Sequence, residues 1–295
     1  MRKILLFIFL NFLWCNVGLA KIVIPLHSWT TQIVMAYVIG GIFENMGYPV
    51  DYASEDSQGV YKKISNGEVS LSHEVWDKVF GKSYNDAIKS GGAVDAGKHA
   101  AFTQEEMGVP TWVIEKNLCP GLPDWNALKN PECVKNFKSS GNKGLMLDGH
   151  ITWHGNTYSE RLEALELNNL WKVEFAGDEK ALWSELSMAK SQGRGVIIFN
   201  WTPNFTDREG FTMINFPEYN EGCSIVEGGD GRCGSPKGSL KKIASTKFVE
   251  KYPKAFKAFQ KINFTTLDIG TMAAYTDLDG MTYKDAANKW LNSNK

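Results

Sequence analysis

Four tryptophans in the 295-residue chain each follow a short apolar run, and this shared position points to one binding site. They are Trp29, Trp76, Trp153 and Trp201, which come soon after the runs at 21–26, 69–75, 144–147 and 196–199. The negative face of an indole attracts a cation by about 0.5–1 kcal/mol when exposed, and by ~2 kcal/mol or more when desolvated. Together the four rings would form a tryptophan cage for a methylated ammonium group, which has no N–H to donate to a carboxylate.

The apolar runs before these tryptophans are predicted to be buried strands. Each is short and bounded by Gly or polar residues, as is typical of a strand covered on both faces. Strands are also predicted at 50–52 and 171–175, and helices at 31–46, 57–66, 159–167 and 178–192. The chain therefore contains two β-α-β-α-β units with parallel strands. In such sheets ligands bind beyond the carboxyl ends of the strands, which is where the tryptophans lie.

This order of elements predicts an α/β protein with two lobes that face each other. Residues 21–109 and 238–295 are expected to form the first lobe, with the second lobe, 110–237, inserted between them. The return to the first lobe is predicted to contain a strand at 240–245, a helix pair at 246–264 and helices at 267–275 and 283–291. A hinge at the two crossings would let the lobes close on a ligand.

Residues 1–20 are predicted to be a secretory signal peptide. Arg2 and Lys3 precede an apolar stretch that is too short to span a bilayer, and small residues follow at 18–20. A lipoprotein signal is disfavoured because the bulky Trp14 precedes Cys15. The formal net charge is −1, and loss of Arg2 and Lys3 would make it −3. This charge balance provides no basic surface for nucleic acid.

Four cysteines would remain in the exported protein. Local pairing of Cys119 with Cys133 and of Cys223 with Cys233 is the simplest of three connectivities, and disulfides suit an exported chain. Neither pair has the spacing of a zinc site, so no metal is expected there, and no cofactor motif is present. The acidic, Gly-rich loop at 227–230 could hold calcium, but a solvated loop is favoured.

The segments around the four tryptophans read HSWTTQ, EVWD, ITWHGN and FNWTPNF. With them the chain resembles the periplasmic substrate-binding proteins of ABC transporters for glycine betaine, choline and trimethylamine N-oxide. The segment CPGLPDWNAL and the loop with Cys223 and Cys233 are most similar to the trimethylamine N-oxide branch. The resemblance covers essentially the whole chain after the signal peptide.

The resemblance implies a type II periplasmic binding protein fold and no catalysis. Trp29 and Trp76 from the first lobe, with Trp153 and Trp201 from the second, would surround the methylated nitrogen of an osmolyte. The implied partners are a membrane permease and its cytoplasmic ATPase. A periplasmic location and a monomer are also expected.

Other site residues follow from the same resemblance. The backbone N–H groups of His154 and Gly155 would bind a ligand carboxylate, and a turn at a helix start is a plausible anion site. Phe80 stands where some betaine binders have a histidine, and this departure favours a smaller acceptor, such as an N-oxide oxygen, or a broad specificity.

Several side chains keep alternative interpretations. Glu74 shares a strand face with Trp76 and could add negative potential to the cage, or form an exposed ion pair. Trp112 lies beside a predicted crossing and could serve either packing or the site. Trp125, Trp171, Trp183 and Trp290 lack the strand-end position and are expected to pack.

A secreted enzyme acting on a choline-like substrate is the rival hypothesis. His154 and Asp148 are the only nearby acid–base pair, and no sequence motif supplies a nucleophile. An exported scaffold without a small ligand is a third possibility.

Overall fold

A computed structural model describes residues 20–137 and 141–294 of the chain. The predicted signal peptide therefore lies, apart from Ala20, outside the described residues. Within those ranges, none of the helices has both the length and the apolar character needed to cross a membrane.

The first part of the chain alternates strand and helix as predicted. Its elements are β1 (Ile22–Leu26), α1 (Thr30–Asn45), β2 (Val50–Ser54), α2 (Val60–Asn66), β3 (Leu71–Trp76) and α3 (Asp77–Lys89). β1 and β2 pair in parallel, and the Ser70 N–H donates to the Val23 carbonyl just before β3 begins. Helix α2 begins later than the predicted position 57, because Asp56 accepts hydrogen bonds from the N–H groups of Gln58 and Gly59 in a turn.

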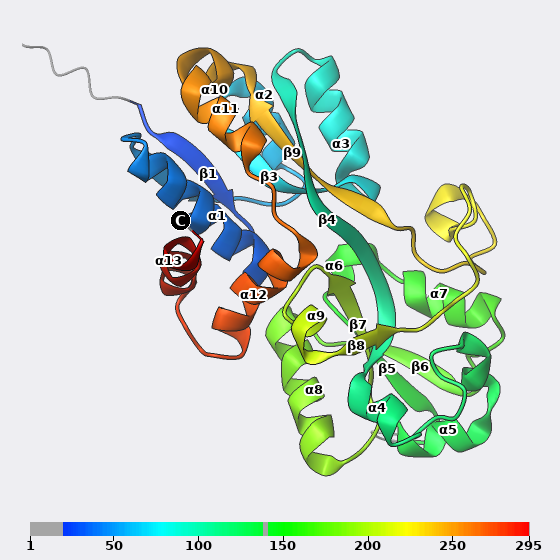
Figure 1. Cartoon of the computed structure of the whole chain (residues 1–295). Coiled ribbons are helices and arrows are strands. Elements are labelled where there is room, and N and C mark those ends of the chain that lie inside the picture. The colour runs from blue at the N-terminus through cyan, green and yellow to red at the C-terminus, as the bar shows by residue number, and fades with distance from the viewer. Residues whose placement is uncertain (1–19, 138–140, 295) are drawn as a thin grey trace, which may run out of the picture.

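The strand β4 (Ala93–Pro110) joins the two halves of the molecule (Figure 1). Its first part pairs antiparallel with β9 (Gly238–Ser245), as far as Thr103 opposite Gly238. From Gln104 onward it pairs with β7 (Ile197–Thr202) and then with β8 (Phe211–Met213). One hydrogen-bonded sheet in the described chain thus runs in the order β3-β9-β4-β7-β5-β6.

The second half contains the other predicted parallel unit. Its remaining elements are α4 (Thr111–Glu115), η1 (Trp125–Lys129), α5 (Pro131–Asn136), β5 (Gly144–Asp148), α6 (Ile151–His154), α7 (Thr157–Ala164), β6 (Trp171–Phe175), α8 (Glu179–Gln192), α9 (Thr206–Glu209) and η2 (Ile225–Glu227). β5 pairs in parallel with both β6 and β7. The α/β class is confirmed, and β4 and β9 add antiparallel pairs that the pattern did not predict.

The chain ends in four helices that return to the first half. They are α10 (Thr246–Lys251), α11 (Pro253–Lys261), α12 (Thr266–Asp277) and α13 (Tyr283–Ser293). Figure 1 shows α12 between α1 and the helices α8 and α9. Helix α12 lies close to the backbone just before α9, since a Cβ on Gly270 of α12 would lie 2.7 Å from the carbonyl oxygen of Asn204. Helix α12 therefore contacts both halves, while the predicted lobe boundaries at 109/110 and 237/238 remain predictions.

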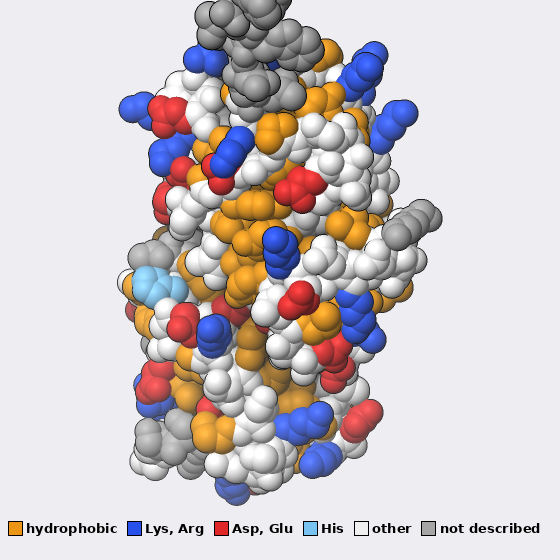
Figure 2. Space-filling model, turned by 90° about the vertical axis from the view of Figure 1, so that its left-hand side faces the viewer, with side chains coloured by type: hydrophobic (Ala, Val, Ile, Leu, Met, Phe, Trp, Pro, Cys, Tyr) orange, Lys and Arg blue, Asp and Glu red, His pale blue; other side chains and the backbone are white. Residues whose placement is uncertain are grey.

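The surface carries mixed charge. On the side shown in Figure 2, basic and acidic side chains are interspersed, and hydrophobic side chains gather along the middle of this face. This pattern agrees with the near-neutral formal charge of the chain and differs from the one-sided basic patch of a nucleic-acid-binding surface.

Candidate functional site

A cavity of about 500 Å³ lies where the two halves meet. It is lined by aromatic, acidic and small polar side chains: Leu26, His27, Ser28, Trp29, Ser54, Glu55, Asp56, Ser57, Gln58, Trp76, Val79, Phe80, Glu105, Trp153, Phe199 and Trp201. All four predicted tryptophans are among them. The volume is in the range of about 300–1,000 Å³ that small-ligand pockets occupy.

Strand and helix ends place the four indoles. Trp29 precedes the first residue of α1, and Trp76 is the last residue of β3. Trp153 lies in α6, which follows β5, and Trp201 lies near the end of β7. The structure thus brings the predicted residues to one place, while their part in binding a ligand remains a prediction.

The aromatic walls of the second half support one another. The rings of Trp153 and Trp201 meet edge to face, with centroids 5.8 Å apart and planes at 87°. Phe199 packs against both, at 5.8 Å from Trp153 and 5.6 Å from Trp201. This packing holds the rings at fixed angles, and fixed angles are needed if their faces are to attract a cation.

Gly149 makes room for one of these walls. A Cβ at this position would lie 2.2 Å from two ring carbons of Trp153, closer than any real side chain can approach. The absence of a side chain at the end of β5 therefore lets the Trp153 ring lie against the backbone.

The walls of the first half are fixed by one buried carboxyl group. Trp29 Nε1 donates to Glu74 Oε1 at 2.7 Å, and Trp76 Nε1 donates to the same oxygen at 3.0 Å. The Thr31 hydroxyl also donates to it. Burial raises the pKa of Glu74 to about 7, and these hydrogen bonds offset part of that rise. Of the two interpretations of Glu74, the exposed ion pair is wrong, because the side chain is buried behind both indoles.

Trp183, in α8, belongs to the surroundings of the cavity, although its lack of a strand-end position led us to expect only packing. Its ring lies 5.4 Å from that of Trp201 and meets Phe205 edge to face at 4.8 Å. The helical pattern of α8 shows which face is apolar but not which strand end lies beneath it. Trp183 therefore supports Trp201 from behind.

Glu105 is an acidic wall residue that the sequence pattern did not single out. It lies on β4, and burial raises the pKa of its carboxyl, while the charge of His154 acts in the opposite direction. The next residue, Glu106, forms a buried ion pair with Arg161 of α7 at 2.5 Å. Alternation along the strand sends these two carboxyls to opposite faces, so Glu106 and Arg161 anchor the strand that presents Glu105.

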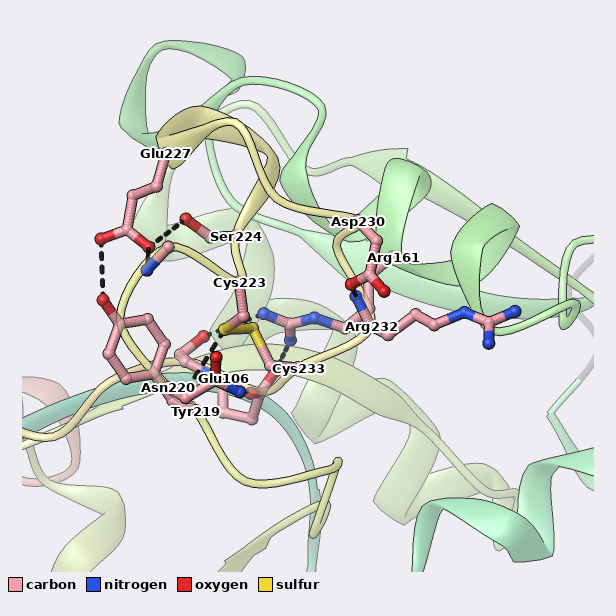
Figure 3. The surroundings of a disulfide bond; sticks show 12 residues. Glu106, Arg161, Tyr219, Asn220, Cys223, Ser224, Glu227, Asp230, Arg232 and Cys233 are labelled. Atoms are coloured by element: carbon pink, nitrogen blue, oxygen red, sulfur yellow. Dashed lines mark hydrogen bonds and ion pairs between the residues drawn. A yellow bond between two sulfur atoms is a disulfide. The ribbon is translucent and has the colours of Figure 1, made fainter.

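A disulfide loop covers the Glu106–Arg161 pair (Figure 3). Its disulfide joins Cys223 to Cys233, and the second disulfide joins Cys119 to Cys133, which is the predicted pairing. Glu106 Oε2 accepts a hydrogen bond from the Ser235 N–H at 2.9 Å, just after the loop.

The acidic groups of this loop accept hydrogen bonds from residues within the loop or just before it. Glu227 accepts hydrogen bonds from the hydroxyls of Tyr219 and Ser224, and Asp230 accepts one from the Arg232 N–H. Across the described ranges, no group of three or more His, Cys, Asp or Glu side chains is placed to hold a metal ion. The favoured interpretation of 227–230 as a solvated loop agrees with these contacts.

His154 and Gly155 lie behind the wall and not among the residues that line the cavity. The Nε2 atom of His154 is 2.7 Å from Asp148 Oδ1, and its ring packs on Phe199 with centroids 4.6 Å apart. The Gly155 N–H donates to the Ile151 carbonyl. The role of His154 and Gly155 in binding a ligand carboxylate remains a prediction. The His154–Asp148 pair, named above as an acid–base pair, faces aromatic rings.

Residues 20–293 match the family described as the substrate binding domain of ABC-type glycine betaine transport system. The chain is also 58% identical over 276 residues to the trimethylamine N-oxide-binding protein of Pelagibacter ubique strain HTCC1062. That match covers 93% of this chain and 88% of the relative.

Solved structures share the fold at low sequence identity. Lactococcal OpuAC in its closed conformation with glycine betaine matches with a TM-score of 0.66 and 16% identity, over 93% of this chain and 96% of that one. A choline-binding protein in complex with choline matches with a TM-score of 0.65 and 14% identity, over 93% and 88% of the two chains. These likenesses confirm the predicted two-lobed fold class.

Proposed function

Because the chain belongs to the family of substrate-binding domains of ABC-type glycine betaine transport systems, we propose that its tryptophan cage binds a methylated onium osmolyte. Trimethylamine N-oxide is the ligand we favour, and glycine betaine is the second candidate. The 58% identical relative, which is named for trimethylamine N-oxide, supports this order.

The observation that carries the proposal is the set of four indoles around one cavity. A methylated ammonium group offers only charge and methyl surface, and indole faces attract both. The buried carboxyl of Glu74, bonded to two of the indoles, adds negative charge behind them when it is ionised. Cation–π attraction and this charge favour a cation over a neutral molecule of the same shape, while dispersion attracts both.

The other end of the ligand is assigned to Glu105. This carboxyl lies in the cavity wall, and burial raises its pKa. A protonated carboxyl can donate to the oxygen of an N-oxide, whereas a carboxylate ligand such as betaine would meet a like charge once Glu105 ionises. Phe80 also lines the cavity, in place of a polar group, and so favours the smaller N-oxide.

We assign the halves of the cage to two lobes, 21–109 with 238–295 and 110–237. Each lobe supplies only part of the cage, so the ligand binds the closed form better and shifts the population toward it. The closed, monomeric protein would act in the periplasm after export, and would deliver the ligand to a membrane permease with its cytoplasmic ATPase. No chemical change of the ligand is involved.

The direct test is calorimetry with trimethylamine N-oxide, glycine betaine, choline and 3,3-dimethyl-1-butanol, the neutral carbon counterpart of choline. We expect at least one onium ligand to bind with a Kd below about 100 µM, a value corresponding to roughly −5.5 kcal/mol. The neutral alcohol should bind at least tenfold more weakly than choline. If no onium ligand binds more tightly than about 1 mM, the osmolyte assignment is wrong. Recovery of the ligand unchanged after incubation tests the binding role against an enzymatic one.

A further inference from the structure

The side chain of Glu179, the first residue of α8, touches both halves of the cage region. It is buried, with 8% of its surface exposed. Glu179 Oε2 accepts a hydrogen bond from the backbone N–H of Thr30 at 3.2 Å, across 149 residues of sequence. Glu179 Oε1 accepts another from the Trp183 indole N–H at 3.2 Å. One carboxyl group thus joins the start of α1 to the helix that supports Trp201.

On the first-half side, Glu179 completes the N-terminus of α1. The first N–H groups of a helix have no partner within the helix and are usually satisfied by a capping side chain. The residue at the cap position of α1 is Trp29, which makes no such bond, and the first turn holds no acidic residue. Glu179 supplies the missing acceptor from the other half and, in its ionised form, also places negative charge at the positive end of the helix dipole.

Thr30 is held by a second carboxyl from the C-terminal helices. Its hydroxyl donates to Asp277 Oδ1, at the end of α12, at 2.8 Å. Thr30, which follows Trp29, is thus held by a backbone hydrogen bond to Glu179 of α8 and by a side-chain hydrogen bond to Asp277 of α12. Since Trp29 is adjacent, these two bonds also fix where its indole enters the cavity.

On the second-half side, the contact continues into the aromatic wall. Trp183 packs on Trp201 and also on Phe205. Phe205 belongs to a small hydrophobic cluster, separate from the main core, that includes Ala273 and Ala274 of α12. The two halves therefore meet here through apolar packing and a hydrogen-bonded carboxyl, away from the strands β4 and β9 that connect them.

We propose that Glu179 is a positioning residue that latches the two halves of the tryptophan cage when the cavity closes on a ligand. This inference rests on the proposed function, because it concerns closure of that same site. Glu179 touches no ligand. It acts through Thr30 on Trp29 and through Trp183 on Trp201, one wall from each half.

The charges around the latch oppose permanent closure. Burial, and then the charge of Asp277, raises the pKa of Glu179 to about 8. Burial raises the pKa of Asp277 to about 6. Glu74 adds a further negative charge, and Tyr283 of α13 also faces the pair. Bringing these groups out of water in their charged form costs free energy, and a ligand bound in the cage would offset that cost.

Two substitutions test the latch. Glu179→Ala removes both acceptors, and Glu179→Gln keeps one acceptor oxygen with nearly the same shape. Glu185→Gln is the matched control, because Glu185 lies on the same helix but pairs with Arg194. Ligand dissociation rates would be measured by stopped-flow tryptophan fluorescence with trimethylamine N-oxide and glycine betaine. Circular dichroism would check that each variant is folded.

Closure would be measured separately, by double electron–electron resonance between spin labels at Asn85→Cys in α3 and Glu163→Cys in α7. Both positions are exposed, one on each half. Ligand should shorten and narrow the distance distribution in the wild type, and leave it broad in Glu179→Ala.

We expect Glu179→Ala to raise the dissociation rate at least tenfold with little change in the association rate, and Glu179→Gln to lie between it and the wild type. Glu185→Gln should match the wild type. The latch is overturned if the wild type binds and closes while both Glu179 variants keep its dissociation rate and its distances. A wild type that binds neither ligand overturns the proposed function instead, so the two failures differ.

Discussion

The Trp29 indole and the Glu74 carboxyl are joined by a hydrogen bond of 2.7 Å, although 45 residues separate them in the sequence. Trp76 shares the same acceptor oxygen. One buried carboxyl thus sets the angle of two walls of the cavity and adds charge behind them. In the cation site that we propose, the geometry of two walls and a nearby negative charge would both come from this single side chain.

Glu74→Gln should therefore weaken binding of every onium ligand by roughly tenfold, or about 1.4 kcal/mol. The amide still accepts a hydrogen bond, so the loss reports mainly the charge. Glu74→Ala should cost more, because both indoles lose their common acceptor. Calorimetry measures the change. Glu68→Gln, at an exposed position three residues before β3, where the side chain accepts a hydrogen bond from Asn66, is the control. Equal affinities for Glu74→Gln and the wild type would rule out a role for the charge.

Removing an aromatic wall should have a larger effect. Trp76→Ala and Trp201→Ala should each lose about 2 kcal/mol, roughly thirtyfold in Kd, because each desolvated indole contributes on that scale. Trp76→Phe keeps a ring and should lose less. Trp125→Ala alters a ring that packs with Lys129 outside the cavity and should leave the Kd unchanged. A wild-type Kd in both wall variants would show that the ligand binds elsewhere.

The pH should change which ligand is preferred. Burial raises the pKa of Glu74 to about 7. As pH rises from 6 to 8.5 the Glu74 carboxyl ionises, which favours the permanent cation choline over trimethylamine N-oxide, whose net charge is zero. The ratio of the trimethylamine N-oxide Kd to the choline Kd should thus rise by about tenfold, the effect of roughly 1.4 kcal/mol.

A ratio is the informative quantity because pH effects on lobe closure, including those through Glu179, act on both ligands alike. Glu74→Gln should flatten the change in this ratio. A ratio that stays constant across the range would contradict the role given to the Glu74 charge.

Gly149→Ala should weaken binding with only a small loss of stability. The new methyl group would lie 2.2 Å from the Trp153 ring, so the ring must move away from the wall. Gly81→Ala is the matched control, since no atom lies within 4 Å of a Cβ there. That control lies inside α3 and should be stabilising by up to about 1 kcal/mol. Ligand titrations and thermal melts of both variants separate the two effects, and unchanged binding by Gly149→Ala would show that Trp153 is not held as described.

Much of this site could be predicted from the sequence because strand ends carry a strong signal. The apolar runs before Trp29 and Trp153 are short and bounded by polar residues, so the strand and its ligand-facing end were both apparent. Cysteine spacing likewise predicted the disulfides. In each case the information is local, within a few residues.

The residues that were missed depend on distant neighbours. β4 carries Lys, Glu and Ala in a pattern that is not clearly a strand, and its pairing with β9 and β7 determines its conformation. Glu105 lies in the cavity wall because β4 places it there. The position of Glu179 in the first turn of α8 predicts only a favourable interaction with the dipole of its own helix. Its hydrogen bond to the start of α1 depends on the folded structure.

The single sheet that runs through β4 has a thermodynamic consequence. Because the ladders to β9 and to β7 share one uninterrupted strand, neither half can lose its structure without exposing the edge of the other. Lobes joined only by flexible linkers would melt separately, but these should melt as one cooperative unit. A calorimetric scan of the ligand-free protein should show one peak, with equal calorimetric and van't Hoff enthalpies. The strand β4, which joins the two halves, would then also make them unfold together on heating.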